Sequence, residues 1–584
     1  MAPMKPSRYL NNLDSFIAAS IGFYAIYLYT AYSGVGISPD SIMYASTATN
    51  IQAHFSLLTF NKTPITFFPV FYPFFLGMVQ FLTGTDPIRA GAMINATLFA
   101  GVVFTSGWIM SKFLVHTSFL TWDNFRKHKF IRNGRILIPI AFILLVDYLI
   151  ALRLGGKVVI PDNLDWLGKS MFFKQPPFAW YNWFLVILRL EIIVIAVSSS
   201  YKRIILAAVI LSPGLLEIYT YLWSETLFIL EIMFFIVAYW RYMQTHQLKW
   251  LLLVGVITAI ACITRYVGIT IIGTGGLMLL LDDQLPWKKK IGHILFYGFL
   301  SISLLVANLV MNNHATGLST GTREPSITPF KDNLYYIGTV ICDWGALTNK
   351  AYPLATVIAA LVFLALIAVL LWKAFKRKIN SYENVVIAFA IVYGLFILIW
   401  ASIQRFERVN SRLLSPMFIP LLIACTSWVP DVLNLVRSKA KYALAGVAII
   451  LMVAFEWETY KADWQRYDDE NDYGVPGYSD DDWNKSEFIV YLRQHKKIYK
   501  KDVPIFTDAN EAVYLFTGMS SELIPHKFFA KDVQKFYANK TFYLIWFDNL
   551  YNGELISLPD IMKNKKLTKI GSAKEGEIYY CDGK

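Results

Sequence analysis

Residues 65–83 read ITFFPVFYPFFLGMVQFLT, an apolar run that holds Pro69 and Pro73 and follows Pro64. A transmembrane helix needs roughly 20 predominantly apolar residues, and this run approaches that length. Proline beyond the first turn removes a backbone hydrogen bond and kinks or breaks a helix. Whether this stretch crosses the membrane determines on which side every later loop lies, so it decides the topology.

The rest of the chain is strongly apolar. Of its 584 residues, 56% are hydrophobic and 16% charged, whereas a typical soluble domain has about 25% charged residues. An all-α polytopic integral membrane protein is therefore predicted. Candidate spans lie near residues 14–33, 65–83, 90–111, 136–153, 178–198, 203–218, 219–240, 249–264, 266–282, 291–312, 353–373, 384–402, 412–429 and 441–457. The first follows Lys5 and Arg8 without a small-residue cleavage site, so we expect it to be retained.

The net charge of +13 comes largely from Lys and Arg in short loops, where they fix orientation in the membrane. We therefore expect no nucleic-acid partner. Basic loops are predicted to be cytoplasmic, and they alternate without conflict from residue 112 to the end. They lie at residues 112–135, 202–203, 241–249, 288–290, 373–378 and 437–441.

The basic loop at 112–135 also settles what happens upstream. With the N-terminus in the cytoplasm, crossing by both 65–83 and 90–111 would place this loop outside. The prolines make 65–83 the better candidate for a re-entrant or interfacial piece of one long outer loop, about 34–89. The prediction is about 13 transmembrane helices within a membrane module, residues 1–457.

Residues 458–584 are predicted to form a small extracytoplasmic α/β soluble domain. Helical periodicity covers 484–497, and short strands are expected at 503–507, 541–547 and 576–580. The acidic opening, from Asp468 to Asp482, lacks the spacing of an EF-hand and is interpreted as a solvated linker. This segment has no Gly-rich phosphate loop and no nucleophile motif, so we expect no catalytic role for it. Cys342 and Cys581 could share a compartment, and their pairing stays open.

Acidic residues near span ends are the first candidates for chemistry. Asp40, in Ser38-Pro39-Asp40-Ser41, follows the first span and is either a helix N-cap, a functional carboxylate or both. The segment from Ile42 to Phe55 is mildly amphipathic and carries Tyr44. Glu225 lies at the outer end of its span, where an ion pair and a ligand contact are both open. Glu217 and Asp147 are interpreted as structural.

Outward-facing arginines are the second group. Arg265 and Tyr266 form a turn between two spans, while Arg405, Arg408 and Arg412 cluster between two later spans. Snorkelling to lipid head groups and binding of an anion are both open for them. The planar guanidinium matches phosphate oxygens. Composition and topology do not choose between group transfer and transport.

Several motifs resemble the GT-C superfamily of membrane glycosyltransferases. The similarity is greatest to bacterial relatives of the dolichyl-phosphate-mannose protein mannosyltransferases and to the aminoarabinose lipid A transferases. The motifs are Pro39-Asp40-Ser41-Ile42-Met43-Tyr44, Phe71-Tyr72-Pro73-Phe74-Phe75-Leu76, Trp223-Ser224-Glu225-Thr226-Leu227-Phe228, Thr264-Arg265-Tyr266-Val267-Gly268 and Arg412-Leu413-Leu414-Ser415-Pro416. Many relatives have Asp-Glu where this chain has Asp40-Ser41, so a second acid comes from elsewhere or is unnecessary. The hairpin at 136–198 resembles an insertion, and no role is carried over to Asp147.

The resemblance implies an inverting transfer of a sugar from a polyprenyl-phosphate donor, on the extracytoplasmic face of a bacterial inner or cell membrane. Asp40 would be the catalytic base. The donor phosphate would be held by Arg265 and at least one of Arg405, Arg408 and Arg412, while Glu225, Tyr44 and Tyr266 would contact donor or acceptor.

The acceptor stays open among lipid, glycan and protein. No acid or His cluster has metal-ligand spacing, so no metal site is assigned and divalent-metal dependence stays open. Two alternatives also remain open: a transporter or flippase of a lipid-linked sugar, and a non-catalytic assembly subunit.

Overall fold

The computed structural model describes residues 12–113, 201–435, 459 and 461–583, apart from positions 346, 348, 349, 406, 549 and 551. The predicted spans 136–153, 178–198 and 441–457, Asp147, and most of the basic loop 112–135 lie outside the described residues. The chain divides into two compact units. The first comprises Met1–Tyr32, Thr66–Phe71 and Ala92–Asp468, and the second comprises Ser33–Ile65, Tyr72–Gly91 and Asp469–Lys584.

The first unit is helical. Five helices in the described part of the chain are long and apolar enough to cross a bilayer: α4 (Pro87–Phe113), α11 (Glu225–Thr245), α14 (Trp287–Thr316), α16 (Tyr352–Phe375) and α17 (Tyr382–Ile403). The remaining helices are α1 (Leu13–Tyr29), α9 (Tyr201–Ile210), α10 (Pro213–Thr220), α12 (Leu248–Thr264), η3 (Tyr266–Gly268), α13 (Ile269–Leu281), α15 (Phe330–Trp344) and α18 (Ser411–Leu435). A helical integral membrane protein is the class that this composition indicates. The count of thirteen spans stays a prediction.

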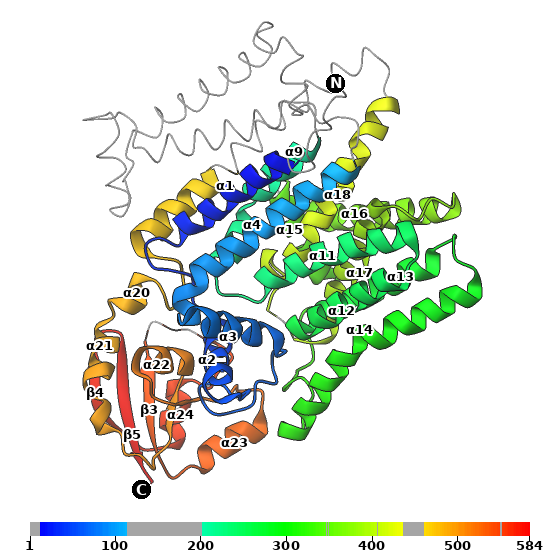
Figure 1. Ribbon diagram of the computed structural model, residues 1–584. Helices are drawn as coiled ribbons and strands as arrows, with labels where there is room; N and C mark the ends of the chain where they lie inside the picture. Colours follow the sequence, from blue (N-terminus) through cyan, green and yellow to red (C-terminus); the bar gives the residue numbers. More distant parts are fainter. Residues whose placement is uncertain are drawn as a thin grey trace, which may run out of the picture. The chain divides into compact units, whose positions relative to one another are not determined.

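Helix pairs in this unit pack closely through small residues. Helix α12 packs on α11 and α14, and α13 packs on α14 and α17 (Figure 1). A Cβ at Gly338 of α15 would overlap the backbone of Ala355 in α16. Glycine at such a crossing lets two helix backbones approach, which is how membrane helices gain packing energy without a hydrophobic drive.

Two expected helices differ in the structure. The predicted span 203–218 is divided into α9 and α10, because Pro213 occupies the first turn of α10 and Ser212 caps it by accepting the Leu215 N–H. The run 219–240 begins with the last two residues of α10, continues through the non-helical residues 221–224, and enters α11 only at Glu225. Helix α15 was not expected, because its Phe330–Trp344 segment mixes polar and apolar residues and lacks the continuous apolar run of a span.

The second unit contains a five-stranded sheet with strand order β2-β1-β3-β5-β4. Strands β2 (Glu522–Leu523), β1 (Ile505–Thr507) and β3 (Thr541–Phe547) are parallel, while β5 (Gly576–Asp582) pairs antiparallel with β3 and with β4 (Leu567–Ala573). The expected strands at β1, β3 and β5 and the predicted small α/β fold are confirmed. Strand β2 has two residues and β4 is mostly exposed, so neither carries a strong strand pattern.

Helices cover both faces of this sheet. Residues of α21 (Glu487–Gln494) and α22 (Asn510–Thr517) pack with Ile545 and Phe547 of β3 on one face. Residues of α23 (Ala530–Ala538) and α24 (Leu558–Asn564) pack with Phe542 and Leu544 on the other. The alternation along β3 follows the two-residue period of a strand. Short pieces α20 (Asp481–Asn484) and η4 (Lys496–Ile498) complete the described elements.

Most of the outer loop, apart from residues 66–71, belongs to this second unit. Helix α2 (Pro39–His54) packs on α22. The Tyr478 N–H donates to the Ile37 carbonyl over 2.8 Å, and the rings of Phe60 and Tyr514 stack at 4.6 Å. The outer loop and the C-terminal segment therefore fold together, although 350 and more residues separate them in the chain.

Helix α3 (Phe71–Thr83) is the helical part of the run 65–83, which decides the topology. It begins after Pro69 and holds Pro73 in its first turn, where a missing N–H costs no intrahelical hydrogen bond. At 1.5 Å per residue it is about 20 Å long, against roughly 30 Å for the hydrocarbon core. This length favours the predicted non-crossing segment, which stays a prediction.

Candidate functional site

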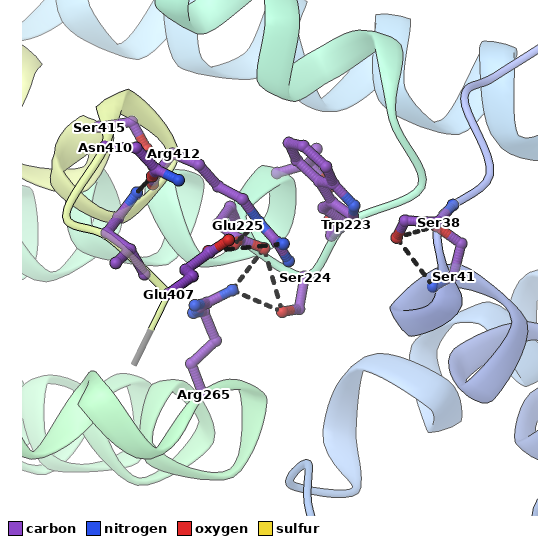
Figure 2. A network of polar contacts seen from close by, with 12 residues as sticks. Ser38, Ser41, Trp223, Ser224, Glu225, Arg265, Glu407, Asn410, Arg412 and Ser415 are labelled. Carbon is purple, nitrogen blue, oxygen red and sulfur yellow. Dashed lines mark hydrogen bonds and ion pairs between the residues drawn. The ribbon is translucent and has the colours of Figure 1, made fainter. Parts of the chain in front are cut away.

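A buried carboxylate joins two arginines in the first unit. Glu225 is the first residue of α11 and is 1% exposed. Its Oε1 accepts a hydrogen bond from Arg412 Nε at 2.6 Å, and its Oε2 pairs with Arg265 (Figure 2). The structure thus brings together Glu225, Arg265 and Arg412, three of the residues that the sequence marked as candidates. Because a buried charge is costly unless it is paired, Glu225 fixes the arginines rather than facing solvent.

Arg265 is held by its position at the end of α12. It is the C-cap residue of that helix, where positive charge suits the helix dipole. Its Nη1 donates to the Ser224 hydroxyl over 2.9 Å. The preceding residue, Thr264, donates its hydroxyl to Glu231 at 2.8 Å. Glu231 was missed in the sequence because it lies within an apolar run, and it anchors the turn that presents Arg265.

Arg412 is unusual because it lies in the first turn of α18, where the helix dipole disfavours a cation. Its guanidinium lies over the Trp223 ring at 4.0 Å, and Asn410 caps the helix by accepting the Leu413 N–H over 3.1 Å. Stacking on Trp223 and the bond to Glu225 together set the plane of the guanidinium. Such a fixed plane is what recognition of a planar or tetrahedral oxyanion requires.

The loop that carries Trp223 and Glu225 is itself fixed from another helix. Asn95 of α4 donates to the carbonyl oxygens of Tyr219 and Tyr221 at 2.9 and 2.7 Å. The Tyr219 hydroxyl donates to the Thr226 carbonyl over 2.9 Å. Asn95 was also missed, since a single Asn in a predicted span gives no signal of its partner.

The three clustered arginines of the sequence have separate partners. Arg405 pairs with Glu324 at 3.1 Å. Arg408 is exposed and lies over the Tyr336 ring at 4.1 Å. Within the described residues, only Arg412 of the three contacts Glu225. The three arginines lie within eight residues of one another in the sequence, but their side chains contact different groups: Glu324, the Tyr336 ring and Glu225.

Tyr266 has a structural contact at the same end of the bundle. Its hydroxyl donates to the Thr66 carbonyl over 3.0 Å and accepts from Asn312 Nδ2 at 3.0 Å. Asn312 also donates to the Ser319 carbonyl. Tyr266 therefore connects α14 and the loop after it to residues 66–71.

Asp40 and Tyr44 belong to the second unit. The N-cap of α2 is Ser38, which exchanges hydrogen bonds with Ser41 in a capping box, so the reading of Asp40 as the cap is wrong. Asp40 lies in the first turn of α2. Tyr44 is buried, and its ring packs edge-on against Tyr72 at 5.0 Å. The roles predicted for Asp40 and Tyr44 in transfer stay predictions.

Acids of the C-terminal segment surround the start of α22. Burial raises the pKa of Asp508 to about 7, against hydrogen bonds from the Phe547 N–H to both carboxylate oxygens at 3.2 and 3.3 Å. Burial also raises the pKa of Glu511, and the charge of Asp40 raises it further. Glu511 is thus an acid, distant in sequence, that interacts electrostatically with Asp40.

The remaining candidates are structural. Glu217 pairs with Arg466 at 3.6 Å, which confirms an ion pair there. The four cysteines are free, so Cys342 and Cys581 do not pair. Across the described ranges, no group of His, Cys, Asp and Glu could hold a metal ion.

No protein-family model matches the sequence, and no curated protein sequence matches it. Among solved structures, the chain is similar to ArnT from Cupriavidus metallidurans. In the apo state the TM-score is 0.48 at 10% identity, and bound to undecaprenyl phosphate it is 0.47 at 9% identity, with 97% of each chain covered. At these values, neither its activity nor its ligand is transferred to this chain.

Proposed function

We propose that this chain is a GT-C-type glycosyltransferase that moves a sugar from a polyprenyl-phosphate donor to an acceptor on the extracytoplasmic face. The observation that carries the proposal is the pairing of Arg265 and Arg412 through the buried Glu225. This pairing fixes two guanidiniums at the ends of three helices, the position that the proposal gives to the donor phosphate. The order of the motifs around Asp40, Glu225, Arg265 and Arg412 adds independent support from the sequence.

The proposed reaction gives Asp40 and the two arginines different tasks. Asp40 accepts the proton of an acceptor hydroxyl, whose oxygen attacks the anomeric carbon of the sugar. The bond from that carbon to the phosphate oxygen breaks, and polyprenyl phosphate leaves as an anion. Arg265 and Arg412 stabilise the charge that builds on the phosphate. Attack from the face opposite the leaving group gives inversion.

A transporter or flippase is the second candidate. Transporter sites usually lie near the bilayer midplane between broken helices. Here Glu225 is the first residue of α11, Arg265 caps α12 and Arg412 lies in the first turn of α18. A site at helix ends favours chemistry at the membrane interface over passage through the middle.

The direct test uses purified protein in proteoliposomes with a radiolabelled polyprenyl-phosphate sugar and an acceptor extract. We expect the label to move covalently to an acceptor and polyprenyl phosphate to be released. Label that changes leaflet without a new covalent product would establish the flippase and contradict the proposal. Repeating the assay with EDTA decides divalent-metal dependence.

Lipid analysis of a deletion strain tests the same function in the cell. Loss of the enzyme predicts an accumulated polyprenyl-phosphate sugar and an under-glycosylated product, and the product identifies the acceptor. A strain that expresses full-length Asp40→Asn is the matched comparison for the deletion strain. It keeps the protein in the membrane and removes only the proposed base.

A further inference from the structure

Arg323 occupies the loop between α14 and α15 and has an unusual environment. Its guanidinium lies over the Phe67 ring at 4.5 Å. It is half-buried and interacts electrostatically with Tyr266, the residue after Arg265. Arg323 therefore belongs to the end of the first unit that carries Arg265.

Among the residues that the structure describes, Arg323 has no acidic partner. Within the described residues, its guanidinium pairs with no carboxylate and donates no hydrogen bond to a protein group, and its contact is the Phe67 ring. Burial lowers its pKa from the ordinary value. A desolvated cation without a partner is costly, and an anionic ligand would offset that cost.

The loop around Arg323 is held in place by its neighbours. The next residue, Glu324, pairs with Arg405 at 3.1 Å, and its carbonyl accepts the Arg405 N–H at 2.8 Å. Ser326 donates its hydroxyl to the Ala401 carbonyl at the end of α17 over 2.6 Å. These contacts fix the backbone on the C-terminal side of Arg323.

Gly321 fixes the other side. It has φ +74°, and a Cβ there would lie 3.0 Å from the Phe67 ring. Only glycine adopts this conformation readily and lets the loop pass so close to the ring. The loop therefore contacts Phe67 through both Gly321 and Arg323, and these contacts fix the position of Arg323.

We propose that Arg323 binds the phosphate of the lipid-linked donor and that Arg405, through Glu324, positions the loop that presents it. This assignment rests on the proposed function and deepens it. It adds Arg323, which no motif marked, to Arg265 and Arg412 as a phosphate contact, and it makes Arg405 a positioning residue instead of a direct contact.

Exposed apolar side chains favour a phosphate carried on a lipid over free phosphate. Phe67 is 47% exposed, Leu318 44% and Ile327 75%. These residues lie in the segments that form or flank the loop of Arg323. A prenyl chain would cover such surface, whereas inorganic phosphate would leave it in water.

The test compares the full-length protein and its variants in phosphatidylcholine nanodiscs. The probes are a polyprenyl monophosphate, the matching polyprenol and inorganic phosphate. Arg323→Gln is expected to weaken polyprenyl-phosphate binding by roughly tenfold to a hundredfold, the range of a charged hydrogen bond. Polyprenol binding is expected to stay unchanged.

Two further variants test the shape and the location of the charge. Arg323→Lys keeps the charge without the planar fork, and its affinity for polyprenyl phosphate is expected to lie between those of the wild type and Arg323→Gln. Lys331→Gln is the matched control, since Lys331 is an exposed cation over the Tyr352 ring in the first turn of α15, the helix that follows the loop of Arg323.

Each outcome decides a different point. Equal binding by Arg323→Gln and the wild type, with both folded by thermal melt, overturns the role of Arg323 and leaves the proposed function intact. Polyprenyl phosphate binding no better than polyprenol to the wild type overturns the proposed function as well. Competition by inorganic phosphate at equal concentration overturns the lipid-linked source.

Arg405 has its own readout. Arg405→Glu is expected to raise the KM for the donor with a smaller change in kcat. The double variant Arg405→Glu/Glu324→Arg is expected to return the KM toward the wild-type value. Restoration distinguishes positioning through Glu324 from direct phosphate contact. A double variant that stays as weak as the single variant would contradict the positioning role.

Discussion

Arg412 and Glu225 form a hydrogen-bonded ion pair, with Nε and Oε1 separated by 2.6 Å and the carboxylate 1% exposed. The pair joins the first turn of α18 to the first residue of α11, two segments 187 positions apart in the chain. Arg265 meets the same carboxylate from the end of α12. One buried acid therefore determines where both arginines point.

Replacing the shared carboxylate should damage both fold and activity. Glu225→Gln leaves two guanidiniums without their buried counter-charge, and breaking a buried pair costs about 3–5 kcal/mol. We expect a clear fall in melting temperature together with a loss of transfer. Glu217→Gln is the control, because its pair with Arg466 is 3.6 Å long and half-exposed, and exposed pairs contribute about 0–1 kcal/mol. Similar damage from both variants would contradict a special role for Glu225.

The shape of Arg412, as well as its charge, should matter. Arg412→Lys keeps the cation but loses the Nε–H that bonds Glu225 and the planar group over Trp223. We expect the affinity for the polyprenyl-phosphate donor to fall by about tenfold, as for loss of one charged hydrogen bond. Donor titration in the transfer assay measures the change in KM. Wild-type KM in this variant would show that charge suffices.

The predicted base can be separated from the helix that carries it. Asp40→Asn is expected to abolish transfer while folding and membrane insertion stay normal, because Ser38 and Ser41 supply the cap of α2. Ser38→Ala is expected to do the reverse, lowering stability by about 1 kcal/mol while retaining most of the activity. Full transfer by Asp40→Asn would end the assignment of the base.

The C-terminal unit should lose stability as pH rises through the range where Asp508 ionises. In the unfolded chain an Asp has a pKa near 4, whereas folding raises the pKa of Asp508 to about 7. The native state therefore holds a proton that the unfolded state releases between these values. The free energy of unfolding falls as pH rises from about 4 to about 7, by up to roughly 1.4 kcal/mol for each pH unit, and then levels off.

Hydrogen exchange of the β3 amides at pH 5 and pH 8 measures this effect. In the wild type, the β3 amides should exchange more slowly at pH 5 than the intrinsic pH dependence of exchange alone predicts. Asp508→Asn should reduce this difference in protection between pH 5 and pH 8. Asp502→Asn, an exposed acid a few residues earlier, should leave it unchanged. Equal pH dependence in all three proteins would show that Asp508 is not the group responsible.

Local patterns sufficed for much of the fold and for part of the site. Continuous apolar runs predicted the long helices, and two-residue alternation predicted β3 and β5, because these signals are contained in consecutive residues. Glu225, Arg265 and Arg412 were marked because charged groups at span ends are rare enough to need a reason. The alternation of the loops predicted that all three lie on one side of the membrane, whereas their mutual contact was not predicted.

Other features depend on partners that no local pattern reveals. Arg405 and Arg412 look equivalent in the sequence, yet one pairs with Glu324 and the other with Glu225. Asn95, Glu231 and Arg323 act through residues on other helices, and their own surroundings in the chain are unremarkable. The interaction of Asp40 with Glu511 depends on α2 packing against α22, across more than 450 residues of sequence.

That packing has a consequence for biosynthesis. Ile37, Ile42 and Phe60 of the outer loop bury their apolar surface with Tyr478, Tyr514 and Leu515. A ribosome makes the loop first and its partners last, so the loop stays without its core until nearly the whole chain has been synthesised. A chain that stops before residue 469 lacks Tyr478, Tyr514 and Leu515, so the apolar surface of the outer loop is left without these packing partners.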